Sequence, residues 1–249
     1  MSSRVIAAFC LIAAPSASMA QVEKNGIEFR FGFGPASAPG YFGDDDTEAG
    51  IGFEVELERL RLGPIATDGT PSYGFGFNPS IRYIAERDAD DFSELEGLDD
   101  IDQSLELGGT LEFTDPNYEV FLTVRYGVIG HEAFVGEIGG DLIYRPTDQL
   151  TVKMGPRVLF GDDSYAETYF GVSSDESAAS AFNAFDPSAG MISAGAAIEA
   201  TYAVSDDWEV IGSVEYAKFQ DDAADSPITD SDEQIGASLV LTRRFTLGF

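Results

Sequence analysis

The chain has 249 residues, of which 14 are Lys or Arg and 44 are Asp or Glu, so its formal net charge is -30. This charge excludes general nucleic-acid binding and argues against docking on an anionic cytoplasmic membrane surface, because both need clustered basic residues. A hydrophobic content of 44% with 12% aromatic residues excludes a disordered acidic chain and indicates a folded domain.

The N-terminal segment has the pattern of a secretory signal. Arg4 provides a positive charge, residues 5–14 are apolar, and Ala20 ends a small-x-small cleavage site. The apolar run is too short to span a bilayer as a helix. We therefore predict a signal peptide over residues 1–20 and a mature domain over residues 21–249. The single cysteine of the chain lies inside this signal, so the mature domain is expected to contain no disulfide.

Beyond the predicted signal, apolar and polar residues alternate over runs of about ten residues, and turn-forming residues separate these runs. This period of two is typical of a transmembrane β-strand, which turns one face to lipid and the other to the barrel lumen. Taken in chain order, the runs predict strands at residues 27–33, 51–58, 73–83, 101–113, 118–129, 133–145, 150–160, 191–203, 208–219 and 233–245.

The connections between these runs alternate in length. Tight turns are predicted at 114–117, 146–149 and 205–207, and longer loops at 35–48, 86–100, 161–190 and 220–232. Short periplasmic turns and longer external loops are what an outer-membrane barrel requires. The segment 59–72 is long where a tight turn is expected, and it could hold two further strands. We therefore predict an all-β fold, an antiparallel transmembrane β-barrel of outer-membrane type with about ten strands, or twelve.

A soluble β-sandwich or lipocalin-like barrel is the competing fold, and it would turn the apolar strand faces inward. The many charges on the polar strand faces and the aromatic residues on the apolar faces argue against it. Aromatic residues near strand ends suit the membrane interface, although ordinary strand aromatics explain them equally well. These residues are Tyr83, Tyr118, Tyr144, Tyr202 and Trp208. The alternating tail that ends in Phe249 is also typical of outer-membrane barrels.

Several separated segments carry a recognisable pattern. The residues are Gly155, Pro156, Arg157, Asp162, Asp163, Tyr165, Thr168, Tyr169, Phe170, Gly171, Asp221, Ala223, Ala224, Asp225, Ser226 and Pro227. With the shorter blocks 97–102, 107–109 and 130–132, they resemble the MipA/OmpV family of outer-membrane proteins from about residue 50 to the end of the chain. The resemblance implies a barrel in the outer membrane. For some members of the family it implies a scaffold that brings a lytic transglycosylase together with a penicillin-binding protein.

Residues that could carry catalysis or bind a metal are few. The one histidine, His131, stands beside Glu132, but no nucleophile-elbow pattern surrounds any serine. One histidine and no cysteine in the mature domain exclude a Cys/His metal site. Acidic clusters at 44–46, 88–91, 99–102 and 221–225 could bind Ca²⁺ or Mg²⁺, or bridge to lipopolysaccharide, but solvated loops are the favoured interpretation. We predict no catalytic residue, no metal and no cofactor.

The polar strand faces predict a charged lumen. The principal lumen charges are Glu106, Glu119, Arg125, Glu137, Asp141, Lys153 and Arg157. Further charges expected to point inward are Glu28, Arg30, Glu54, Glu56, Arg82, Asp102, Glu199, Glu215 and Arg244. They could form a cation-favouring pore or a plug of salt bridges. About ten to twelve strands lie between a barrel filled by its side chains and an open channel, so a narrow or closed lumen is expected.

Three functions remain open on this evidence. The leading hypothesis is a non-catalytic scaffold whose periplasmic face binds murein-remodelling and murein-synthesising enzymes. The first alternative is a narrow, cation-preferring porin for small solutes. The second is a surface adhesin or ligand-binding barrel that acts through loops 161–190 and 220–232. The expected partners are outer-membrane lipid and lipopolysaccharide, a lytic transglycosylase and a penicillin-binding protein, and no nucleic acid.

Overall fold

The computed structural model describes residues 25–62, 65–67 and 73–248. The predicted signal peptide and Phe249 lie outside these residues, and the signal stays a prediction. The described strands are β1 (Gly26–Ala38), β2 (Glu48–Leu62), β3 (Ile65–Thr67), β4 (Gly74–Ile84), β5 (Ser104–Asp115), β6 (Tyr118–Ile129), β7 (Phe134–Thr147), β8 (Leu150–Gly161), β9 (Gly190–Ala203), β10 (Trp208–Phe219) and β11 (Glu233–Gly248).

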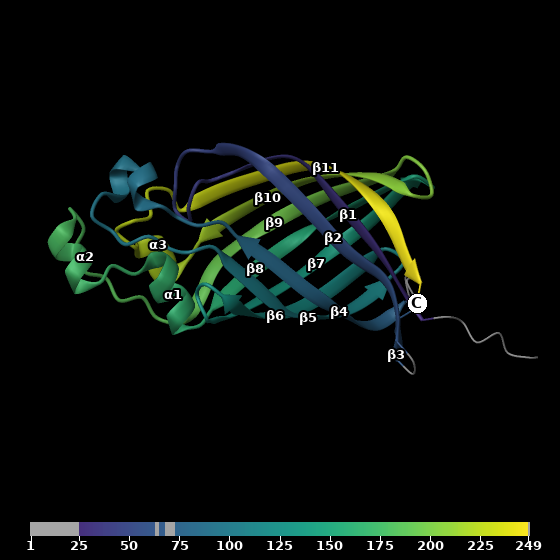
Figure 1. Cartoon of the computed structure of the whole chain (residues 1–249), viewed down its shortest axis with the longest axis horizontal. Helices are drawn as coiled ribbons and strands as arrows, with labels where there is room; N and C mark the ends of the chain where they lie inside the picture. The colour runs from purple at the N-terminus through teal and green to yellow at the C-terminus, as the bar shows by residue number, and fades with distance from the viewer. Residues whose placement is uncertain (1–24, 63–64, 68–72, 249) are drawn as a thin grey trace, which may run out of the picture.

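The strands form one antiparallel sheet in the order β3-β2-β1-β11-β10-β9-β8-β7-β6-β5-β4. Strands β1 and β11 pair directly, from Gly26 with Gly248 to Ser37 with Ala237. The sheet curls into an incompletely closed barrel (Figure 1). The prediction of an antiparallel outer-membrane-type barrel with ten long strands is confirmed, and each predicted run coincides with one long strand.

The segment between β2 and β4 differs from the twelve-strand alternative. It contains one short strand among its described residues, β3, which pairs through Ile65–Thr67 with the Leu60–Leu62 end of β2. Strand β2 extends to Leu62, beyond the end of its predicted run, so it takes up the first part of segment 59–72. Two further membrane-spanning strands are therefore not present in the described part of this segment.

Side chains of the wall are arranged inside out relative to a soluble protein. Phe75 is 78% exposed and Phe53 is 65% exposed on the outer face, whereas Arg30 and Glu106 are buried on the inner face. Because successive side chains of a strand point to opposite faces, the alternating pattern places apolar groups toward lipid and charges in the lumen.

The tight turns and the long loops lie at opposite ends of the barrel. Tight turns join β5 to β6, β7 to β8 and β9 to β10, on the end where the chain terminates (Figure 1). Tyr118, Tyr144, Tyr202 and Trp208 lie at this end with exposed side chains, as expected for an interface girdle. We assign this end to the periplasm, because outer-membrane barrels have short turns on that side.

The four long loops pack together into one structure, here called the cap, formed by residues 39–47, 85–103, 162–189 and 220–232. It contains two 3₁₀ helices, η1 (Ala89–Asp91) and η2 (Ser93–Leu95), and three short α-helices, α1 (Asp163–Phe170), α2 (Ser174–Ala179) and α3 (Asp221–Asp225). Figure 1 shows these helices gathered at one end of the barrel. No helix in the described ranges is long and apolar enough to cross a membrane.

The cap has a hydrophobic core of its own, which the sequence analysis did not predict. One cluster lies where the cap meets the barrel rim and contains Ala133, Val135, Tyr165, Ala166, Tyr169, Phe170, Ile192, Phe219 and Ala223. A second cluster within the cap contains Tyr41, Ala89, Leu95, Leu98, Val172 and Ile228. The interpretation as solvated loops concerned the acidic clusters of these segments, and the sequence analysis made no prediction for their apolar side chains, which are buried together.

Candidate functional site

Helix α1 anchors the cap to the barrel rim, and its ends follow from its sequence. The Asp162 carboxylate accepts hydrogen bonds from the backbone N–H groups of Tyr165 at 2.9 Å and Phe134 at 2.7 Å. The first bond caps the helix, and the second ties the helix to β7. The helix ends at Gly171, whose N–H donates to the Glu167 carbonyl at 3.0 Å.

The segments that resemble the MipA/OmpV family come together in this cap. Tyr165 and Phe170 are completely buried, and the Ser226 hydroxyl donates to the Phe170 carbonyl at 2.6 Å. The Thr168 hydroxyl donates to the Ser164 carbonyl, and the Asp163 carboxylate accepts the Ala189 N–H. Helix α3 contains Asp221, Ala223, Ala224 and Asp225, and Ser226 and Pro227 follow it. Gly155, Pro156 and Arg157 lie apart from the cap, on β8. Most of these residues therefore have a structural role in the cap.

The histidine predicted as the one candidate base has both ring nitrogens engaged. His131 Nδ1 accepts the Ala133 N–H at 3.1 Å, so Nε2 carries the proton and donates to Glu106 Oε1 at 3.2 Å. Its side chain is 0% exposed, and its acidic partner is Glu106, not the neighbouring Glu132. Glu132, the sequence neighbour considered as an acidic partner, has a positive φ of 49° in the tight loop and lies exposed.

The Ser104 and Tyr169 hydroxyls beside His131 are also engaged. Ser104 Oγ accepts the His131 backbone N–H at 3.2 Å and the Tyr169 hydroxyl at 3.1 Å. Burial raises the pKa of Tyr169 and also that of Tyr165 above the ordinary value for tyrosine. Both phenols therefore stay protonated at neutral pH. The cluster locks the β6–β7 loop onto β5 and leaves no free base beside a hydroxyl.

The seven principal lumen charges lie on neighbouring strands and are all in ion pairs, five of them in one chain and two in a separate pair, a set here called the ladder. It consists of Glu106, Glu119, Arg125, Glu137, Asp141, Lys153 and Arg157, from β5 to β8. Arg125 contacts Glu106 at 2.8 Å and Glu137 at 3.1 Å. Arg157 contacts Asp141 at 2.8 Å and approaches Glu137 at 3.9 Å, and Lys153 contacts Glu119 at 2.9 Å. A functional role of these lumen charges stays a prediction.

A second group of ion pairs lies on β1, β2, β10 and β11, nearer the end with the tight turns. Arg30 on β1 contacts Glu58 at 2.7 Å and Glu209 at 3.1 Å. Arg244 on β11 contacts the other oxygen of Glu58 at 2.6 Å. The alternation of β1, β2 and β11 indicates these charges, but sequence reasoning did not pair them, because their partners are as much as 186 positions apart.

Two other inward carboxylates have no basic partner among the described residues. No ion pair of the described residues involves Glu54 on β2 or Glu215 on β10. Asp102 was expected in the lumen but lies before the start of β5, in the cap. The prediction for Asp102 was wrong, because the chain leaves the alternating strand geometry two residues before β5 begins.

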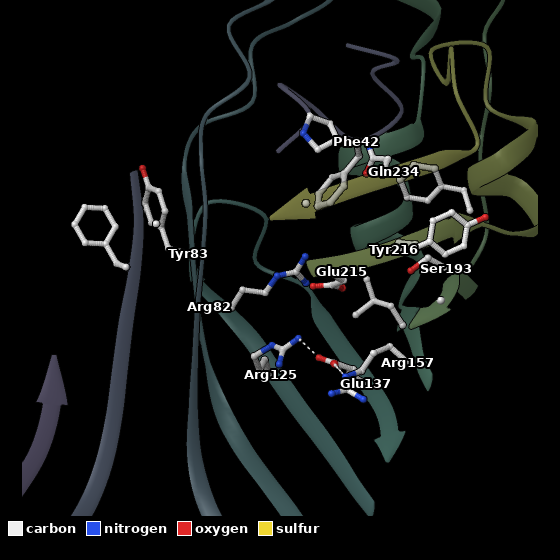
Figure 2. Close-up of a pocket in the computed structure, with 18 of the residues that line it drawn as sticks. Phe42, Arg82, Tyr83, Arg125, Glu137, Arg157, Ser193, Glu215, Tyr216 and Gln234 are labelled. Carbon is white, nitrogen blue, oxygen red and sulfur yellow. Dashed lines mark hydrogen bonds and ion pairs between the residues drawn. The ribbon is translucent and has the colours of Figure 1, made fainter. Parts of the chain in front are cut away.

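A cavity of about 710 Å³ lies in the outer half of the lumen, beneath the cap. Phe42 and Phe219 border it on the cap side, and its walls include charged residues from six strands (Figure 2). The charged residues are Glu54, Arg82, Arg125, Glu137, Arg157 and Glu215. Figure 2 shows Arg82 reaching toward Glu215 across the cavity, and Arg125 paired with Glu137. The cavity is the candidate binding site within the lumen.

The acidic clusters of the loops shape the cap. The Asp44 carboxylate accepts the backbone N–H groups of Gly40 and Asp46, and Asp88 caps η1. The Asp100 carboxylate accepts the N–H of Ala89. No group of three or more His, Cys, Asp or Glu residues in the described part of the chain is placed to hold a metal ion. A divalent-cation site at these clusters has no geometric support.

Comparison with known proteins identifies the family of the chain. The family model described as MltA-interacting protein MipA matches residues 31–245. The chain belongs to this family. Over 89 residues the chain is 35% identical to the MltA-interacting proteins of Escherichia coli K12 and Shigella flexneri. This stretch covers 35% of the chain and 36% of each relative, so the chain matches only about a third of the length of these curated proteins.

Solved structures with similar shape are outer-membrane proteins of low sequence identity. The COG4313 outer-membrane channel from Pseudomonas putida F1 is 11% identical, with a TM-score of 0.46 over 94% of this chain and 100% of that one. The NanC porin is 9% identical, with a TM-score of 0.38 over 87% of this chain and 98% of that one. Scores of this size assign no activity to the present chain.

Proposed function

We propose that this MipA-family protein is an outer-membrane barrel that acts as a non-catalytic scaffold for murein-remodelling enzymes. Its first partner would be a lytic transglycosylase, and its second a penicillin-binding protein. The name of the family and of the curated relatives, MltA-interacting protein, supports the first partner. The observation that carries the proposal is the lumen itself: its principal charges are paired and the cap lies over its outer end.

The non-catalytic part of the proposal rests on the His131 cluster. A general base needs a free ring nitrogen within reach of the proton that it abstracts. Both His131 nitrogens are engaged, one by the Ala133 N–H and one by Glu106. The side chain is also completely buried, so a substrate has no access to it. His131 therefore fits a structural role, and the acting surface would lie elsewhere.

The periplasmic turns offer the docking surface. Arg145 donates to the Pro116 carbonyl at 2.6 Å, and Tyr202 donates to Gln149 at 3.4 Å, so neighbouring turns are tied together. Exposed carboxylates on these turns form an acidic rim, consisting of Asp148, Asp206 and Asp207. A rigid acidic rim fits a partner with a basic patch, since complementary charge raises the association rate and fixes orientation.

Capture of a purified lytic transglycosylase by the refolded barrel in nanodiscs tests the proposal. Charge reversal of the rim (Asp148→Lys, Asp206→Lys, Asp207→Lys) is expected to weaken capture about tenfold or more, most strongly at low salt. Reversal of Asp90 and Asp175, which lie exposed in the cap, is the matched control and is expected to leave capture unchanged. Equal capture by all variants, or none by the wild type, would contradict docking at the rim.

A second candidate function, a narrow cation-preferring channel, is favoured by the cavity and its unpaired carboxylates. Glu54 and Glu215 both line the 710 Å³ cavity. Carboxylates in a lumen attract cations, as in the charged rings of cation channels. Single-channel current in a planar bilayer decides this candidate. Steady cation-selective current steps that become smaller in Glu54→Gln and Glu215→Gln variants would support a channel. A folded barrel without current steps would rule out the channel and favour the scaffold.

A further inference from the structure

The barrel wall has an open seam between β2 and β4. The sheet order ends at β4 on one side and at β2 with β3 on the other, and no backbone pairing joins β2 to β4 in the described residues. Strand β3 covers only the Leu60–Leu62 end of β2. In the outer part of the seam, the edges of β2 and β4 therefore face each other without backbone hydrogen bonds between them.

Apolar side chains on the outer face lie on both sides of the seam. Outward side chains beside the seam (Ile51, Phe53, Ile81, Tyr83) are 61–66% exposed. Outward side chains on strands with two neighbours reach the same exposure, 63% for Phe33 on β1 and 65% for Leu142 on β7. The absent backbone pairing, and not the exposure of side chains, therefore defines the seam.

The seam opens into the lumen cavity. Outward side chains on both edges line that cavity, Ile51 and Phe53 from β2 and Ile81 and Tyr83 from β4. Inward neighbours on the same strands, Glu54 and Arg82, line it as well. Figure 2 shows Tyr83 and Arg82 on opposite sides of their strand, with Arg82 reaching into the cavity. One continuous space thus has an apolar mouth toward the lipid and a charged interior.

The interior has charges of both signs that are not fully paired. The Arg82 side chain keeps 29% exposure, its ion pair with Glu106 is long at 3.8 Å, and its Nη1 makes no hydrogen bond with any described residue. Glu54 and Glu215 line the same space without an ion pair among the described residues. A ligand that brings one anionic and one cationic group would satisfy both sides.

We propose that the seam is a lateral port that binds a single-chain zwitterionic amphiphile, of the lysophosphatidylethanolamine kind, from the outer membrane. Its acyl chain lies in the mouth between Ile51, Phe53, Ile81 and Tyr83. Its phosphate contacts Arg82, and its ammonium group contacts Glu54 and Glu215. The open strand edges are compatible with a membrane because irregular backbone is tolerated at membrane depth where it lines a water-filled cavity.

This proposal is independent of the docking role. The port lies in the outer half of the barrel, whereas the acidic rim lies at the periplasmic turns. Loss of transglycosylase capture would therefore leave it standing, and the reverse also holds. The test has two other outcomes. Strand β2 could pair directly with β4, or a strand from a second copy of the chain could fill the seam.

Binding of fluorescent lysophosphatidylethanolamine to the refolded mature protein in detergent tests the port. Lysophosphatidylglycerol, which lacks the ammonium group, is the comparison ligand. We expect the zwitterion to bind about tenfold more tightly than the anionic lipid to the wild type. We expect Arg82→Gln to weaken both about tenfold, as for loss of one charge-assisted hydrogen bond. The double change Glu54→Gln with Glu215→Gln should remove the preference for the zwitterion.

Variants at the mouth separate the port from nonspecific adsorption of lipid on the barrel wall. Phe53→Asn and Ile81→Asn should weaken binding of both lipids, whereas Leu239→Asn, on the outer face of β11, should not. Faster migration of unheated than of boiled samples in gels checks that each variant folds. Equal binding by mouth and control variants, or no head-group preference in the wild type, would overturn the proposal.

A cysteine pair tests the two other occupants. The mature chain has no cysteine of its own if the signal is removed as predicted, so Phe53→Cys with Ile81→Cys is a clean reporter. A disulfide needs Cβ atoms about 3.8 Å apart. If the seam is an open port, the two cysteines should form little disulfide, and only bifunctional reagents with a longer spacer should cross-link them. Rapid, complete disulfide formation within one chain would show a closed wall, and between chains a second copy at the seam, and either result would overturn the port.

Discussion

The cap and the barrel wall use the same apolar residue types in opposite ways. In the cap, Tyr165 and Phe170 are completely buried, as in a soluble protein. In the wall, Phe75 and Phe53 are exposed while Arg30 and Glu106 are buried. The same chain therefore follows two rules, because the cap folds in water and the outer face of the wall contacts lipid. The solvent on each side decides which residues form the core.

This difference predicts that the cap can unfold while the barrel wall stays folded. Truncation of a buried Phe costs about 3–5 kcal/mol, and Phe170→Ala removes contacts shared by α1, Phe42 and Phe219. We expect the cap loops to become sensitive to protease while the barrel keeps its heat-modifiable gel mobility. Phe75→Ala on the lipid face is the matched control and should leave both properties unchanged. Loss of the whole barrel in Phe170→Ala would contradict separate folding of the cap.

The loss of stability on removing a lumen charge should increase with the burial of its ion pair. Arg125→Ala leaves the completely buried Glu106 without its closest cation, and breaking a buried pair costs about 3 kcal/mol or more. Lys153→Ala removes a pair whose lysine is 35% exposed, so we expect about 0–1 kcal/mol. Urea unfolding in lipid vesicles measures both. Equal losses for the two variants would show that burial does not set the worth of the ladder, and Glu106→Gln should partly rescue Arg125→Ala.

A single cap hydrogen bond gives a smaller effect. The Ser226 hydroxyl donates to the Phe170 carbonyl at 2.6 Å, and both groups are buried. Ser226→Ala leaves that carbonyl unpaired and should destabilise the cap by about 1–3 kcal/mol. Hydrogen exchange of the α1 amides reports the loss. Ser93→Ala, at an exposed cap position, is the control, and an equal change in both variants would remove the assigned role of Ser226.

The smallest expected effect is a dependence of the cap on pH. Burial alone would raise the pKa of Glu176, but hydrogen bonds from the Ser173 and Asp99 backbone N–H groups outweigh burial and lower it. A depressed folded-state pKa gives stability that is present above the ordinary glutamate pKa and is lost as the pH falls through the folded value. Exchange of the Asp99 amide should therefore speed up in acid, and Glu176→Gln should flatten this dependence. An unchanged pH profile in Glu176→Gln would contradict the assignment.

The wall could be predicted from the sequence because its information is local. Alternation along one strand, such as Tyr118 to Val128 on β6, fixes both the strand and the face that meets lipid. The inward direction of Glu106, Arg125 and Arg157 follows from the same alternation. The exact pairs do not follow, because a partner on another strand depends on register, which turn lengths and bulges set.

The cap could not be predicted because its information is not local. Helix α1 has eight residues and α3 has five, too short for a helical period to be distinguished from a loop. Phe42, Tyr169 and Phe219 come from three distant segments and meet only in the folded chain. Asp162 before α1 and the Ser173–Glu176 capping box before α2 were signals that could have indicated helices within the loop. The open seam between β2 and β4 has no sequence signal that we can identify.

We propose that the periplasmic turns, and not the cap, bind the partner enzyme. A binding isotherm of a purified lytic transglycosylase on nanodisc-embedded barrels tests it most directly, with the wild type compared with the rim reversal at Asp148, Asp206 and Asp207 and with the cap variant Phe170→Ala. The account predicts that the rim reversal raises Kd about tenfold and that Phe170→Ala leaves it within about twofold. Unchanged binding in the rim reversal with lost binding in Phe170→Ala would contradict the account and would favour an adhesin that acts through loops 161–190 and 220–232.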